Sequence, residues 1–211
     1  MDAATPPPRK RGRPPRAPDA PSDTREALLR AGLVALTEKG FSATGIDEVL
    51  STVSVPKGSF YHYFKSKEAF GAELIDRYAA HFAARLDRHF ADDTLTPLAR
   101  LEAFTRSAEA SMARHDFRRG CLVGNLGQEM GALPEPFRQR LAGVFADWQV
   151  RTASCLARAQ AAGEIDPDRD PDQLAAFFWI GWEGAVLRAK LERTAAPLRT
   201  FADGFFALVR G

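Results

Sequence analysis

The chain has 211 residues, of which 45 % are hydrophobic, and its two cysteines, Cys121 and Cys155, are too few for a disulfide scaffold. No apolar run approaches the ~20 residues that span a bilayer, and no apolar signal segment opens the chain, so we expect a cytoplasmic globular protein. The net charge of +2 is too small to indicate a partner by itself, but it is unevenly distributed.

Residues 1–21 hold seven of the fourteen prolines and five basic against two acidic side chains, whereas the rest of the chain carries about −1. Such a segment buries too little apolar surface to offset its ordering entropy, so we expect a disordered arm. Its sequence RGRP at 11–14 resembles an AT-hook, which implies that Arg11 and Arg13 enter a narrow minor groove. A basic tail that only attracts phosphates is the alternative.

A first helix is predicted at 24–39, inside a folded unit that we place at 22–68. Asp23 and Glu26 have the spacing of a helix start, and leucines then recur at helical intervals. Gly40 follows a lysine in the last turn and suits the residue after a helix end.

Two shorter helices follow. Thr44 and Asp47 form a second capping pair, which predicts a helix from there to Thr52. Pro56 suits the first position of a third helix at 56–64, because its missing N–H would have no partner there. Two short helices with a tight turn between them, after a longer one, form a helix-turn-helix, which is a DNA-binding unit.

The remaining residues, 69–211, are also predicted to be helical and to form a second domain. A helix that starts near Lys67 carries apolar residues at every fourth position, and this stripe winds round the helix so that it can contact the head and a second core. Five more helices are predicted at 97–115, 122–130, 134–162, 171–193 and 198–209. Because no segment alternates as a strand would, the fold class is all-α.

The segment at 55–70, VPKGSFYHYFKSKEAF, resembles the recognition helix and following turn of the TetR family of transcriptional regulators, and EKGF at 38–41 and TGID at 44–47 resemble it too. Ser54 stands where that family usually has glycine, which adds strain if the turn is left-handed. The resemblance implies a ligand-responsive repressor in which a helix-turn-helix head binds DNA and a larger domain binds an effector and forms a homodimer. By position, the implied DNA contacts are Thr44, Lys57, Gly58, Ser59, Tyr61, His62, Tyr63 and Lys67.

The residues of this segment support the same interpretation. Phe60 and Phe64 are one turn apart and should pack inward. Residues 55–67 carry three lysines and no acid, which leaves a cationic edge for phosphates and bases. A two-fold dimer would bind an inverted repeat whose half-sites lie about one DNA turn or more apart.

The last two predicted helices are candidates for the dimer interface. The first has Phe177, Phe178, Ile180 and Leu187, and its Gly181 and Gly184 would let a partner helix approach closely. The second has apolar residues at helical steps, namely Leu198, Phe201, Phe205 and Leu208. The alternative is that both helices only close the core of their own subunit.

Two central segments, 118–130 and 179–190, resemble a subgroup of this family whose members respond to acrylate or sense electrophiles through a cysteine. This resemblance implies acrylate as effector and genes of acrylate and dimethylsulfoniopropionate metabolism as targets. The candidate effector-binding residues are Tyr78, Arg118, Arg119, Cys121, Asn125, Glu129, Trp182, Glu183 and Lys190.

Acrylate is a small carboxylate with an electrophilic double bond, so its pocket needs a charge or donors and an apolar wall. The charge can come from Arg118, Arg119 or Lys190. Tyr78 or Trp182 can form the wall, and Cys121 becomes a reactive thiolate if Lys190 lowers its pKa. A small buried hydrophobe is the alternative role of Cys121. A regulator of the same fold that senses electrophiles or oxidants through Cys121 is the alternative function.

Other classes of protein fit less well. An enzyme would need more than Cys121 and His115, which lack a third orienting group, and the four histidines are scattered. We therefore expect no catalytic site, metal or cofactor. An architectural protein that binds A·T-rich DNA through the arm alone would have no use for a sensor domain. For the switch, we expect effector binding to change the angle of the helix that starts near Lys67.

Overall fold

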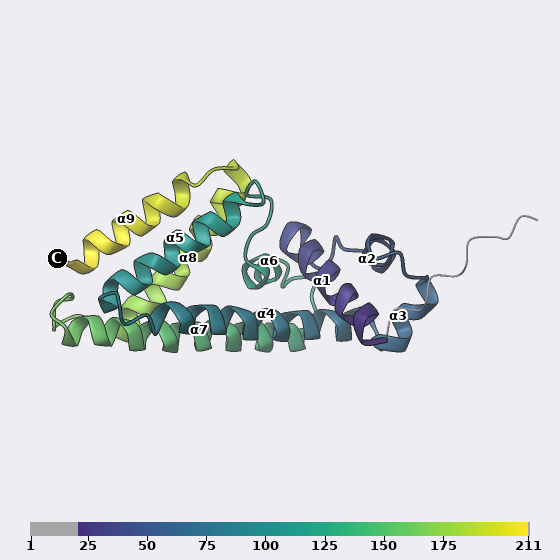
Figure 1. Ribbon diagram of the computed structural model, residues 1–211, viewed down its shortest axis with the longest axis horizontal. Coiled ribbons are helices and arrows are strands. Elements are labelled where there is room, and N and C mark those ends of the chain that lie inside the picture. The colour runs from purple at the N-terminus through teal and green to yellow at the C-terminus, as the bar shows by residue number, and fades with distance from the viewer. Residues whose placement is uncertain (1–20, 211) are drawn as a thin grey trace, which may run out of the picture.

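The computed structural model describes residues 21–210, which form α-helices and contain no β-strand (Figure 1). The helices are α1 (Pro21–Lys39), α2 (Ile46–Thr52), α3 (Lys57–Tyr63), α4 (Lys67–Phe90), α5 (Pro97–Ala113), α6 (Leu122–Gln128), α7 (Glu135–Ala161), α8 (Pro171–Glu192) and α9 (Ala196–Arg210). The predicted all-α class is confirmed. The proposed arm contacts, Arg11 and Arg13, lie outside the described residues.

Helices α1–α3 form a small head at one end of the molecule (Figure 1). Phe60 of α3 and Phe64, which follows this helix, are buried as predicted. Their rings contact Phe70 at the start of α4, with centroids 5.3 and 4.7 Å away. Ser54 has φ 57°, so the turn between α2 and α3 is left-handed and carries the expected strain. Gly40 has φ 83° and ends α1, also as predicted.

The helix starts in the head differ from the prediction. The residue that precedes α2 is Gly45, not Thr44, and no side chain caps the start of this helix. The hydroxyl of Thr44 instead donates to the carbonyl of Gly40 at 2.6 Å, so the predicted Thr44–Asp47 capping pair is wrong. Helix α1 begins three residues earlier than expected, and Glu26 accepts hydrogen bonds from Arg77 of α4 rather than capping its own helix.

Helix α4 runs from the head into the second domain. The predicted apolar stripe of α4 is buried at both ends. Phe70 and Leu74 pack against the head, and Leu86 and Phe90 pack into the larger core. Arg25 of α1 donates to both carboxylate oxygens of its α4 partner, Glu73, at 2.5 and 2.6 Å. These contacts fix α1 on the first half of α4.

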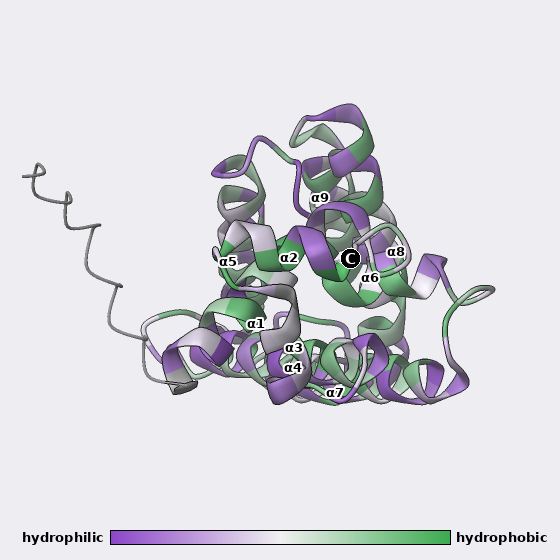
Figure 2. Ribbon diagram, turned by 90° about the vertical axis from the view of Figure 1, so that its right-hand side faces the viewer, coloured by the Kyte–Doolittle hydropathy of each residue, from purple (hydrophilic) through white to green (hydrophobic). Residues whose placement is uncertain are grey.

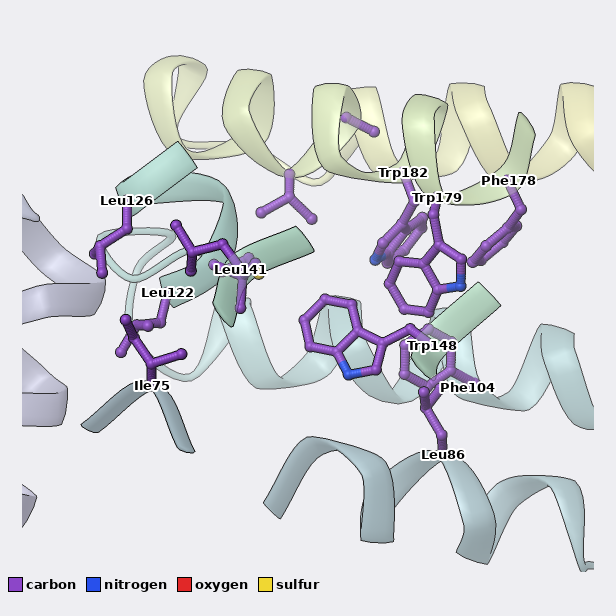
Figure 3. Close-up of a cluster of buried hydrophobic side chains, with 14 of the residues drawn as sticks. Ile75, Leu86, Phe104, Leu122, Leu126, Leu141, Trp148, Phe178, Trp179 and Trp182 are labelled. Atoms are coloured by element: carbon purple, nitrogen blue, oxygen red, sulfur yellow. The ribbon is translucent and has the colours of Figure 1, made fainter. Parts of the chain in front are cut away.

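The second domain packs α5, α8 and α9 over the paired helices α4 and α7 (Figure 1). Its core is rich in aromatic rings, and Figure 3 shows Trp148 of α7 facing Trp179 of α8, with centroids 4.9 Å apart. At the other end of this cluster, Leu122 and Leu126 of α6 lie near Ile75 of α4 (Figure 3). Buried leucines therefore fix α6 between the head and the aromatic core.

Hydrophobic and hydrophilic residues alternate along each ribbon, as the view from the head end shows (Figure 2). This is the pattern of amphipathic helices that bury one side and expose the other. Between Pro21 and Arg210, no helix has the length and apolarity needed to cross a membrane.

Candidate effector pocket and DNA-binding helix

Helix α3 presents part of its predicted DNA-contact set to solvent. Tyr61 is 58 % exposed and His62 is exposed as well, while Gly58 leaves the backbone open near the start of the helix. Ser59 is half-buried, and the half-buried Tyr63 lies beside the ring of Phe64. Lys57 opens the helix. The exposed hydroxyl and imidazole groups of α3 are therefore free to reach DNA phosphates or base edges.

Two other predicted DNA contacts are positioned differently. Thr44 is only 3 % exposed and its hydroxyl is already used within the head, so its side chain does not face solvent. Lys67 opens α4, and its ammonium lies 4.5 Å from the ring centre of Phe41. That cation–π contact holds the lysine stem against the head.

A pocket of about 220 Å³ opens between α4, α5, α8 and the segment before α6. It brings together five of the nine predicted effector-binding residues, namely Tyr78, Arg119, Cys121, Trp182 and Glu183. It also contains residues that the sequence did not single out, chiefly Thr37, His81, Phe82, Arg85 and His115. Thr37 belongs to α1, so the pocket touches the DNA-binding head directly.

The thiol of Cys121 interacts with Tyr78 and Glu183 in one wall of the pocket. Burial, followed by the nearby Glu183 carboxylate, raises the pKa of the Cys121 thiol well above its usual range. Burial also raises the pKa of Glu183 to about 7 and that of Tyr78 well above 10. The expectation that Lys190 makes Cys121 a thiolate is therefore wrong, because burial and an acid dominate at this position.

Four predicted effector residues contact the C-terminal end of α1, and three of them lie outside the pocket. The amide of Asn125 donates to the carbonyls of Leu36 and Thr37 at 3.1 and 2.8 Å. The ammonium of Lys190 donates to Thr37 O at 3.2 Å and to Asn125 Oδ1 at 3.3 Å. A helix leaves its last four carbonyls without internal partners, and these donors satisfy two of them.

The same contact surface continues past the helix end. Glu129 accepts the backbone N–H groups of Phe41 and Ser42 at 2.8 and 2.7 Å. Arg119, which lines the pocket, donates to Glu38 of α1 at 3.0 Å. We call these contacts of Arg119, Asn125, Glu129 and Lys190 with residues 36–42 the α1 clamp. Arg118 is exposed and lies outside both the pocket and the clamp.

Gly40 is required at the clamp for two reasons. Its φ of 83° is disfavoured for other residues, and a Cβ added there would lie 1.8 Å from Glu129 Oε1. The glycine that ends α1 thus also makes room for the carboxylate that holds the next turn.

Helix α6 connects the pocket with the clamp. Cys121 precedes its first turn, and the sulfur accepts the N–H of Gly124 at 3.4 Å. Glu129 follows its last turn. A displacement of Cys121 by a ligand would therefore move the group that holds the turn after α1.

The outer face of α8 carries an apolar stripe. Phe177, Ile180, Leu187 and Leu191 are exposed at helical spacing, and Ile180 is 73 % exposed. Gly184 lies on this stripe with no atom near its Cβ position. Of the other predicted interface residues, Leu208 of α9 is exposed as well. The rest are used inside the subunit, since Phe178, Leu198 and Phe205 are buried and Gly181 makes room for Phe201. A stripe of this kind is suited to a partner subunit.

Comparisons with known proteins agree with this arrangement. Residues 28–74 match the family model "Bacterial regulatory proteins, tetR family", and residues 97–205 match "Tetracyclin repressor-like, C-terminal domain". The chain is 60 % identical over 196 residues to the transcriptional regulator AcuR of Cereibacter sphaeroides, covering 93 % of this chain and 89 % of AcuR. It is 33 % identical over 180 residues to the HTH-type transcriptional repressor NemR of Escherichia coli strain K12, covering 83 % of this chain and 88 % of NemR.

Solved structures are similar as well. The crystal structure of regulatory protein TetR from Rhodobacter sphaeroides has a TM-score of 0.85 at 60 % identity, covering 86 % of this chain and 96 % of that chain. The reduced form of Escherichia coli NemR has a TM-score of 0.79 at 31 % identity, covering 87 % and 95 %.

The exposed α3, the pocket and the clamp define a helix-turn-helix transcriptional regulator with a sensor domain, not an enzyme. The chain belongs to the TetR family, and it is a transcriptional repressor similar to AcuR. Regulators of this family bind DNA, form homodimers and respond to small-molecule effectors.

Proposed function

We propose that this regulator binds an inverted-repeat operator as a homodimer and is released when acrylate occupies the pocket. The genes controlled would then serve acrylate and dimethylsulfoniopropionate metabolism. The observation that carries the proposal is that α6 begins at Cys121 in the pocket wall and carries Asn125 and Glu129, two residues of the α1 clamp, further along. A ligand that prefers one position of α6 necessarily biases the head as well.

The pocket supports a small unsaturated carboxylate. A volume of about 220 Å³ suits a compact ligand, and Tyr78, Phe82 and Trp182 provide an apolar wall for a vinyl group. The carboxylate of such a ligand would be bound by a cationic side chain of the pocket, which is identified below.

For the DNA complex we propose that α3 enters the major groove with Tyr61 and His62 at phosphates or base edges. Lys57, Gly58, Ser59, Tyr63 and Lys67 remain proposed contacts at its flanks, and Arg11 and Arg13 of the arm would reach an adjacent minor groove. The exposed stripe of α8 supports the homodimer, whose two-fold axis explains why the operator is an inverted repeat.

The alternative function is sensing of electrophiles or oxidants through Cys121. Its position in the pocket wall favours such a role, whereas its raised pKa weakens it, because only the thiolate is strongly nucleophilic. The variant Cys121→Ser separates the two functions. If the variant is still released by acrylate, noncovalent recognition is sufficient, and if only electrophile-induced release disappears, the thiol is a separate sensor.

The test is a mobility shift with DNA from upstream of the protein's own gene, titrated with acrylate and, separately, with propionate. We expect release by acrylate at concentrations where propionate, which lacks the double bond, has little effect. Specific binding that neither compound weakens would rule out acrylate as the effector and leave the DNA-binding role intact.

A further inference from the structure

Arg85 is a cation in the pocket without an acidic partner among the described residues. It lies on α4, half-buried, and its guanidinium donates to the hydroxyl of Ser107 at 3.0 Å. Its carbon CZ also lies 5.7 Å from the ring centre of Phe104. Neither contact neutralises its charge, so the guanidinium keeps donors available for a ligand.

The surroundings of Arg85 are positive. Burial lowers its pKa, Tyr78 opposes this shift, and Arg114 and Arg88 lower the pKa further. Burial also lowers the pKa of His89, and Arg85 is the next contributor. An arginine nevertheless stays charged at neutral pH, so this wall of the pocket holds an uncompensated cation.

The other charged groups of the pocket cannot take this role. Arg119 is already paired with Glu38. Lys190 does not line this pocket, and its ammonium is engaged at the end of α1. Glu183 is the acid of the pocket, but it interacts with Cys121 and does not shift the pKa of Arg85. His81 and His115 line the pocket from exposed positions.

We propose that Arg85 binds the carboxylate of the effector and makes this pocket selective for small anions over neutral molecules of the same shape. The inference rests on the proposed function and adds the residue that binds the charged group of the ligand. A half-buried cation that lacks a counter-charge gains most from a carboxylate, since the pair satisfies both charges. The fork of the guanidinium also fits the two carboxylate oxygens together.

The anchor position agrees with the rest of the pocket. Arg85 and Tyr78 are two helical turns apart on α4, and long helical side chains lean toward the N-terminus of their helix. A carboxylate held by Arg85 therefore leaves the rest of the ligand on the side of Tyr78 and Cys121, where α6 begins. One end of the small ligand, the carboxylate, is thus recognised by its charge, and the other end displaces α6.

The test is calorimetric titration of the full-length protein with acrylate and with acrylamide, its neutral counterpart of similar shape. Arg85→Gln should weaken acrylate binding by about 10- to 150-fold, the range for a hydrogen bond to a charged group, and leave acrylamide binding unchanged. Arg85→Lys should retain part of the affinity, because it keeps the charge but loses the fork. Arg88→Gln, which removes an exposed arginine from the same helix, should bind as the wild type does.

Acrylate binding by Arg85→Gln at wild-type affinity, or an equal loss in Arg88→Gln, would overturn the assignment. Melting curves of the variants check that each is folded. The operator-release assay separates this inference from the proposed function. If acrylate binds through Arg85 but does not release DNA, the anion site stands and acrylate is not the effector. If acrylate releases wild type and Arg85→Gln alike, the function stands and the Arg85 assignment is wrong.

Discussion

The clamp can be broken by one substitution. Glu129→Gln keeps the shape of the side chain but removes its charge and one of the two acceptors for the N–H groups of Phe41 and Ser42. Hydrogen bonds to a charged group contribute about 1.5–3 kcal/mol each, and partial exposure reduces this to about 1–2 kcal/mol for the pair. That is comparable to a typical coupling between two sites, about 1–3 kcal/mol. We therefore expect a variant that binds operator and acrylate but is hardly released.

The assay is fluorescence anisotropy of a labelled operator duplex at fixed salt, with and without saturating acrylate. The ratio of the two dissociation constants measures the coupling. Gln128→Ala is the matched control, because it changes the neighbouring exposed residue, whose amide hydrogen-bonds to Gly124 of the same helix. Hydrogen exchange at Phe41 and Ser42 reports whether the clamp has opened. Fast exchange at both amides of Glu129→Gln would show that the clamp is open. If acrylate then still weakens operator binding by the wild-type factor, the clamp does not couple the two sites.

Three further predictions follow from the described contacts. Gly40→Ala should lower the free energy of unfolding by about 2–3 kcal/mol in urea, because it adds both a positive-φ penalty and a clash. Gly143→Ala, exposed within α7, should instead raise it by about 0.5–1 kcal/mol. Burial raises the pKa of Glu183 from its ordinary value of 4.5 to about 7, so the stabilisation present at low pH is lost as pH rises through that range. Glu183→Gln should abolish this dependence and be more stable than wild type at pH 8 by about 1–3 kcal/mol, whereas a persistent pH slope would contradict the assignment. Ile180→Asp should give monomers by light scattering, and Val150→Asp, equally exposed on α7, should stay dimeric.

The helices could be predicted from sequence because local signals define them. Gly40, Pro56 and the apolar spacing of α4 each act within a few residues, and the predicted bounds differ from the structure by at most about three residues. The Thr44 cap failed because the hydroxyl found a carbonyl four residues back, a choice that the local pattern does not determine.

The pocket could be predicted only in part. The resemblance of 118–130 to ligand-responsive relatives brings Asn125 into the candidate set, but its partners are two backbone carbonyls, 89 and 88 residues away in the chain. No local pattern shows such a partner. Arg85 was missed because a lone arginine on a long helix is usually solvated, and only the packing of α5 and α8 around it leaves it half-buried without an acid.

The central claim is that the pocket and the DNA-binding head are coupled through α6. Coupling between two binding sites is reciprocal, so acrylate affinity should be measured by calorimetry for the free repressor and for its operator complex. The account predicts that operator DNA weakens acrylate binding by the same factor, about 5- to 150-fold, by which acrylate weakens operator binding. Equal acrylate affinity of the free and DNA-bound repressor would contradict it.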